Sequence, residues 1–224
     1  MLDLNKSEWS ILIGLLLLSF IPSVGGVFRL VELVTGSGFL PENPRIQAVP
    51  FPAVLHILSA TLYCIVGAFQ FLPSVRRRHP NWHRLAGRLL VGAGLVSAIS
   101  GLWMTHYYSF PDYLQGHLLY AIRIFVAFSM ASFIFLGLSA VFKKRIAQHQ
   151  VWMIRAYALG QGAGTQVLIS IPWLLTTGEP SGISRDILMT AAWMINIFVA
   201  EWIINTRVRL KRTARVRSSS KHNT

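Results

Sequence analysis

The sequence predicts an all-α fold, a polytopic membrane bundle of six transmembrane helices, from three observations. Of the 224 residues, 53% are hydrophobic and only 13% are charged, whereas soluble domains hold about 25% charged residues. Six apolar stretches are each long enough, at about 20 residues, to cross a hydrocarbon layer as a helix. Lysine and arginine gather in short runs between these stretches. A soluble enzyme domain is therefore excluded, and the single cysteine, Cys64, excludes a disulfide scaffold.

The six stretches follow one another with turn-forming residues between them. They cover residues 9–34, 52–73, 84–107, 117–142, 152–175 and 186–206. Glycine, proline, serine and aspartate mark the connections, as in Phe110-Pro111-Asp112. We expect residues 1–206 to form one domain with the second to fifth helices as its core. The basic segment 207–224 is expected to be a disordered tail near anionic headgroups.

The first stretch has a second interpretation. Lys6, the apolar run from Ile11 and the small residues up to Gly26 are also arranged as in a cleaved signal peptide. The apolar run continues as far as Leu33, which favours a helix that stays in the membrane.

The basic residues predict the orientation of the bundle. The chain has 21 lysines and arginines and a net charge of +13. The predicted helices place most of them on one side: Lys6, the loops around Arg76–Arg78 and Lys143–Arg145, and the tail after residue 206. By the positive-inside rule, both termini are cytoplasmic. Because most of the basic residues lie in loops and termini between apolar stretches, a nucleic-acid partner is not expected.

Four histidines form two layers in this topology. His83 and His149 lie at the cytoplasmic ends of the third and fifth helices, and His56 and His117 lie toward the outer ends of the second and fourth. A haem b iron accepts two neutral imidazoles from opposite faces, and facing helices of a bundle can supply them. These four residues are therefore candidate metal ligands, with His83 and His149 the better pair.

Small residues near the inner histidines fit a flat macrocycle. Gly87 and Gly94 share the helix face of His83, while Ala156 and Gly160 share that of His149. The same residues also suit plain helix packing, and interface histidines are often only solvated. Both interpretations stay open at this point.

Three arginines are further candidates for binding a cofactor. Arg123 lies inside the fourth helix, where a charge must face protein or water. It could hold a haem propionate or a substrate anion, or bond to carbonyls at a helix end. Arg84 and Arg88 could bind anions on the inner side, although their role in orientation also accounts for them. Glu201 is expected to pair with a neighbouring basic residue.

Two motifs resemble a known family. The segment from His56 to Arg88 contains Gly67-Ala68-Phe69-Gln70-Phe71 and His83-Arg84-Leu85-Ala86-Gly87-Arg88, and a second motif begins at His149-Gln150-Val151-Trp152. Both resemble an uncharacterised family of predicted bacterial membrane proteins, domain of unknown function 2306. The resemblance implies a location in the bacterial inner membrane, and no established activity.

The order of helices and histidines is similar to that of the transmembrane cytochrome b561 group. In that group, the second and fourth helices hold one haem b and the third and fifth hold another, and electrons cross the membrane. This likeness implies electron transfer, as an oxidoreductase or a carrier, with a redox partner or a quinone-like small molecule. The group's ascorbate-contacting motif has no counterpart here.

The rival class is a membrane protein without haem. It would be an assembly factor for respiratory complexes or a small-molecule transporter. A transporter usually has broken helices in related halves of the chain, and the sequence gives only a weak sign of them.

Overall fold

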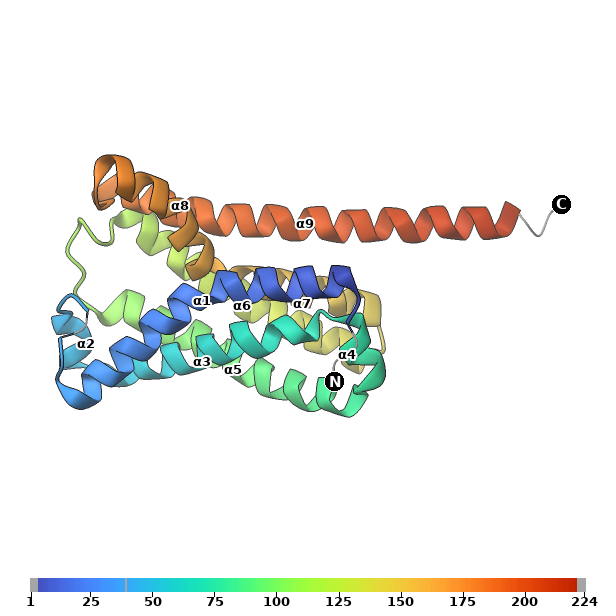
Figure 1. Ribbon diagram of the computed structural model, residues 1–224, viewed down its shortest axis with the longest axis horizontal. Coiled ribbons are helices and arrows are strands. Elements are labelled where there is room, and N and C mark those ends of the chain that lie inside the picture. The colour runs from blue at the N-terminus through green and yellow to red at the C-terminus, as the bar shows by residue number, and fades with distance from the viewer. Residues whose placement is uncertain (1–3, 39, 221–224) are drawn as a thin grey trace.

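The all-α fold is confirmed by the computed structural model, which describes residues 4–38 and 40–220, with side chains as far as residue 206. The described part consists of helices and their connections, without strands (Figure 1). The helices are α1 (Lys6–Thr35), α2 (Pro44–Ala48), α3 (Pro50–Gln70), α4 (Pro73–Arg78), α5 (Pro80–Tyr107), α6 (His117–Phe142), α7 (Ile146–Gly160), α8 (Gly162–Thr177) and α9 (Gly182–Ser220).

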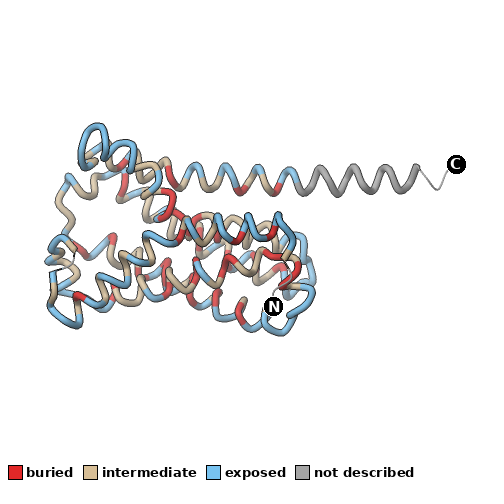
Figure 2. Tube along the Cα trace, in the orientation of Figure 1, coloured by how far each residue is buried: buried red, intermediate tan, exposed pale blue. Residues whose placement is uncertain are grey.

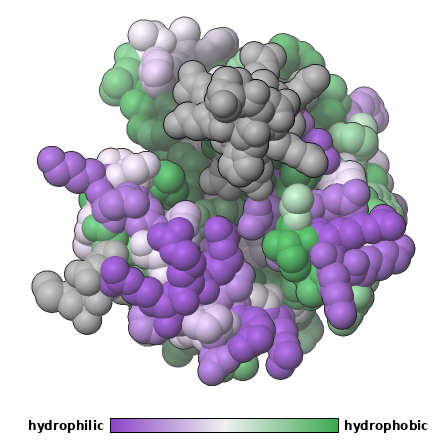
Figure 3. All heavy atoms as spheres, turned by 90° about the vertical axis from the view of Figure 1, so that its right-hand side faces the viewer, coloured by the Kyte–Doolittle hydropathy of each residue, from purple (hydrophilic) through white to green (hydrophobic). Residues whose placement is uncertain are grey.

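The long helices run side by side, so the bundle has two ends (Figure 1). The start of α1, helix α4, the start of α5 and the α6–α7 turn meet at one end, which we call the basic end. Helix α2 and the connections 108–116 and 178–181 lie at the other end, called the far end. Figure 3 looks onto the basic end and shows hydrophilic side chains gathered there in patches.

Five helices of the described part are long and apolar enough to cross a membrane: α1, α3, α5, α6 and the segment Gly182–Thr206 of α9. Many of their large apolar side chains face outward, including Leu17, Phe20 and Phe198, which are more than half exposed. Buried residues lie mainly where helices face one another (Figure 2). An apolar outer surface of this kind requires a lipid environment.

The predicted fifth helix, 152–175, is divided in two. Helices α7 and α8 meet at Gln161, and neither reaches the length of a continuous span. Carbonyl groups at the end of α7 receive side-chain donors from other helices: Asn196 Nδ2 donates to the Ala158 carbonyl (3.0 Å), and Cys64 Sγ to that of Gly160 (3.4 Å). Such donors are what a break inside a membrane needs, because no water is there to replace them.

A buried chain of hydrogen bonds starts at the same break. The Tyr157 hydroxyl donates to the Cys64 carbonyl on α3 (2.6 Å) and accepts from Gln161 Nε2 (2.6 Å). The Gln161 amide group also exchanges hydrogen bonds with the Ser19 hydroxyl on α1 (3.0 and 3.1 Å). Polar groups from three helices thus satisfy one another in the interior.

The core comes from the second to fifth predicted helices, which confirms that expectation. Its buried cluster joins α3, α5, α6 and α7, with Tyr63, Leu90, Ile134 and Tyr157 among its members. Helix α1 adds a second cluster in which Leu12 packs against the end of α3 and α4.

Several helix boundaries differ from the prediction. Helix α7 begins at Ile146, so His149 lies within it rather than before it. Prolines at their first positions start the short helices α2 and α4, which lie inside predicted loops. Helix α9 continues to Ser220, past the predicted end at 206. The disordered tail over 207–224 stays a prediction, because the side chains there and residues 221–224 lie outside the described part.

A buried carboxylate joins two helix starts at the basic end. Asn5 and Glu8 form a capping box at the start of α1. The Glu8 carboxylate also accepts from the backbone N–H of Ser74 (2.6 Å) and from its hydroxyl (2.7 Å), in the first turn of α4. This contact fixes the basic loop next to the start of α1.

We expect the contact of α8 with α1 to be sensitive to a single methyl group. A Cβ at Gly164 would lie 2.0 Å from the Leu18 carbonyl oxygen, and backbone atoms cannot move aside cheaply. Gly164→Ala should lower the free energy of unfolding by about 1–3 kcal/mol. Gly92→Ala on α5 is the matched control, since a Cβ there has no neighbour within 4 Å. Unfolding in mixed micelles, followed by circular dichroism, measures both; equal stability of the two variants would contradict this packing.

Candidate functional site

The inner histidines come together at the basic end. His83 lies in the first turn of α5 and His149 in the first turn of α7. His149 and Arg76 both act electrostatically on His83. The turn after Phe142 and the Pro80 start of α5 bring both residues to the same level of the bundle.

One inner histidine is oriented by the backbone and the other is not. His149 Nδ1 lies 3.0 Å from the Gly137 carbonyl oxygen of α6, which leaves Nε2 as the free nitrogen. His83 Nδ1 is buried without a hydrogen-bond partner in the described structure, and so is Nε2 of the Gln70 amide group. A buried polar atom left unpaired costs about 1–3 kcal/mol, which a ligand can recover.

Tyr63 occupies the space that two of the small residues leave. A Cβ at Gly94 or at Gly160 would lie 2.8 Å from the Tyr63 ring, so this ring packs between α5 and α7. At Gly87, one turn from His83, the nearest atom to such a Cβ is Gln70 Oε1, at 3.7 Å. Gly94 and Gly160 therefore serve helix packing, and a Cβ at Gly87 would make only ordinary van der Waals contact with Gln70.

The other two histidines have different surroundings. His56 packs against α5, where its Nδ1 lies 2.9 Å from the Ser97 carbonyl oxygen and 3.2 Å from the Ser100 hydroxyl. It interacts electrostatically with Arg123. His117 is the first residue of α6 and is exposed. His56 thus has a fixed ring with one free nitrogen, while His117 lies at the surface of the far end.

Arg123 contacts side chains from α9 and from the connection before α6. Its Nη1 donates to the Gln115 side-chain oxygen, and its Nη2 contacts the Met189 sulfur at 3.9 Å. The guanidinium carbon lies 5.2 Å from the centre of the Phe110 ring, which also carries Arg45 at 4.6 Å. The sequence pattern did not reveal which side chains contact this half-buried cation.

Asp186 has a structural role that the sequence analysis did not identify. It is 2% exposed, and its carboxylate accepts from the backbone N–H groups of Gly116 (3.2 Å) and Leu119 (3.1 Å) at the start of α6. It also provides a negative charge near Arg123 and Arg185, and Glu179 provides another near Arg185. A lone carboxylate at the edge of an apolar stretch was the available signal.

The remaining charged candidates lie nearer the surface. Arg84 and Arg88 are exposed, and Arg84 donates to the Asn81 side chain (2.5 Å). Arg155 forms a two-pronged ion pair with Glu201 on α9, at 2.5 and 3.0 Å. This pair confirms the expectation for Glu201 and fixes α9 to α7.

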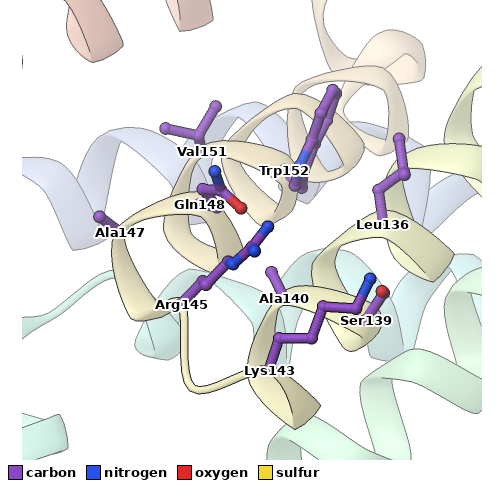
Figure 4. Close-up of a pocket in the computed structure, with 9 residues that line it drawn as sticks. All are labelled: Leu136, Ser139, Ala140, Lys143, Arg145, Ala147, Gln148, Val151 and Trp152. Carbon is purple, nitrogen blue, oxygen red and sulfur yellow. The ribbon is translucent and has the colours of Figure 1, made fainter.

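Two pockets open near the basic end. One, of about 320 Å³, lies beside α3, α4 and α5, and His79 and Trp82 line it. The other, of about 450 Å³, lies between the end of α6 and the start of α7 (Figure 4). Neither pocket is lined by His83 or His149.

Residues 53–204 match a family described as predicted membrane protein (DUF2306). The matched region runs from α3 into α9 and includes both inner histidines. No curated protein and no solved structure matches the chain.

We expect Asp186 to be essential for the far end. Asp186→Asn would remove the negative charge near Arg123 and one of the two near Arg185, and it would weaken the cap of α6. The free energy of unfolding should fall by about 3 kcal/mol or more. Asp112→Asn, an exposed carboxylate at the same end, should change it by less than about 0.5 kcal/mol. Thermal unfolding in detergent compares the two variants. An unchanged stability of Asp186→Asn would refute this role.

Proposed function

The chain belongs to the DUF2306 family of predicted membrane proteins, and we propose that it is a b-type haem electron-transfer protein of the membrane. This proposal rests on one observation. His83 and His149 lie at the same end of the bundle and interact electrostatically, and the buried Nδ1 of His83 has no hydrogen-bond partner in the described structure. Two imidazoles from separate helices at one depth are what a bis-histidine haem requires.

The inner residues fit such a group in three respects. The bond of His149 Nδ1 to the Gly137 carbonyl fixes the ring and leaves Nε2 for a metal, as in many ligating histidines. Gln70 adds an unpaired amide nitrogen, and its side chain lies beside Gly87. Tyr63 limits the site on the side away from the basic end.

Bound haem would supply a reversible one-electron couple, whose potential the axial ligands and their hydrogen bonds set. The protein's part is to hold and orient the imidazoles and to exclude water. Arg84 and Arg88, exposed on α5, can neutralise carboxylates at the edge of the inner site.

A second haem site would use His56 and His117. Support for it comes from His56, whose Nδ1 lies beside the Ser97 carbonyl, and from Arg123, which interacts with His56 and can neutralise a propionate. His117 would have to turn inward from its exposed position. The inner pair is therefore the first site to test.

The proposal includes a location and partners. The basic end would face the cytoplasm of a bacterial cell, with both termini there and the far end outside. A protein redox partner or a quinone-like small molecule would then exchange electrons with the haem.

A transporter is the second candidate, because one observation favours it. The break between α7 and α8 at Gln161 lies in the interior, and discontinuous helices often form transporter binding sites. An assembly factor for respiratory complexes remains in the same haem-free class. Colour separates the classes, since a haem protein absorbs visible light after purification and the others do not.

The test is the visible spectrum of protein purified in detergent from haem-replete cells. We expect the bands of a six-coordinate b-type haem. His83→Ala and His149→Ala should each remove the same share of the absorbance, and the double variant no more, because the iron needs both ligands.

His79→Ala is the matched control, since this histidine lies at the basic end and is exposed. It should keep the full spectrum. A colourless parent protein would refute the haem function, whereas full haem content in His83→Ala would refute only the inner pair.

The proposed orientation has a separate test. Reporter fusions after Arg78, after Arg145 and at Thr224 should report the cytoplasm, and fusions at Asp112 and Glu179 the outside. A cytoplasmic signal at Asp112 would contradict the predicted topology.

A further inference from the structure

The turn between α6 and α7 has an unusual residue at its centre. The N–H of Arg145 donates to the Ala140 carbonyl and the N–H of Lys144 to that of Val141 (both 2.8 Å), which is the Schellman pattern of a helix end. Lys144 holds the left-handed position of this motif, with φ 56°. Glycine is the usual residue there, so the middle one of three consecutive basic residues stands where its backbone conformation is disfavoured.

The pocket beside this turn has apolar walls. Leu136 and Ala140 of α6 and Val151 and Trp152 of α7 line a space of about 450 Å³. The surface next to it is also apolar, since the Phe142 side chain is 81% exposed. In a chain whose outer surface faces lipid, such a groove opens to the acyl chains.

Polar groups lie at one end of the same pocket. Lys143 and Arg145 line it from the turn, with Ser139 and Gln148 next to them. Figure 4 shows the Arg145 and Gln148 side chains directed into the pocket, and the Lys143 side chain extending toward Ser139. Lys143 and Arg145 are exposed, and the two cations are therefore available to a ligand.

The start of α7 adds to the positive potential. This helix has 15 residues, and no side chain caps its N-terminus. Its first N–H groups point toward the end where Lys143 and Arg145 lie, and such groups favour anions. No carboxylate is among the residues that line the pocket.

We propose that this pocket binds an anionic phospholipid, with the headgroup phosphate held by Lys143 and Arg145 and an acyl chain along Leu136, Val151 and Trp152. Basic pockets at the membrane surface select anionic over zwitterionic headgroups. The apolar walls favour a lipid over a soluble phosphate. The site is separate from the inner histidines and does not depend on haem.

Native mass spectrometry in dodecyl maltoside tests the site. Phosphatidylglycerol should remain bound, whereas phosphatidylcholine with the same acyl chains should not. In the double variant Lys143→Gln with Arg145→Gln, the affinity for phosphatidylglycerol should fall about 30-fold, since each basic residue contributes roughly a fivefold gain. Lys6→Gln, which removes an exposed charge elsewhere at the basic end, should bind as the parent does.

A variant of unchanged charge tests the pocket itself. Ala147 is exposed and lines the pocket, so Ala147→Trp should fill the space and reduce lipid binding while the protein still folds. Equal binding of the two lipids, or full binding in both pocket variants, would refute the proposal. Competition by millimolar inorganic phosphate to the same extent as by lipid would assign the pocket to a soluble anion instead and refute the lipid.

Discussion

The structure depends on one constraint, that polar groups in the interior of the bundle must find partners within the protein because water is absent. The clearest case is the chain from Ser19 through Gln161 and the Tyr157 hydroxyl to the Cys64 carbonyl. It joins α1, α3 and α7 at the point where the predicted fifth helix breaks. The carbonyls at the break have their own partners, because Asn196 Nδ2 donates to Ala158 and Cys64 Sγ to Gly160. Without these donors, backbone groups would be left unpaired in an apolar medium, at several kcal/mol each.

The position of α7 follows from the same contacts and determines the inner site. Tyr157 packs on α3 and Arg155 pairs with Glu201 on α9, so α7 is fixed against both of these helices. His149 then lies at the same end of the bundle as His83 and acts on it electrostatically, and its Nδ1 lies beside the Gly137 carbonyl. The unpaired nitrogens of His83 and Gln70 are left at the edge of a well-packed core, which is the kind of position where a cofactor completes the hydrogen bonding.

Two buried carboxylates organise the ends of the bundle. Glu8 caps α1 and binds the first turn of α4 at the basic end, and Asp186 of α9 caps α6 at the far end. Each places a negative charge where a helix N-terminus is positive. The basic residues that surround these ends, including the run Lys143–Arg145, are left to face headgroups and solvent. At the far end, side chains that bond to backbone groups, as Asp186 and Tyr108 do, add to the packing of the helices.

The sequence by itself determined the all-helical membrane fold, the core helices and the family, because long apolar runs and the placement of charges depend on local composition. Only the tertiary structure decided the break at Gln161. Gly160, Gly162 and Gly164 permit a break, but Asn196 and Cys64, distant in sequence, satisfy the groups it exposes. It likewise decided that Gly94 and Gly160 receive the Tyr63 ring, and that Asp186 caps a helix 67 residues before it in the chain. These outcomes rest on contacts between remote segments, which helical periodicity and local composition do not encode.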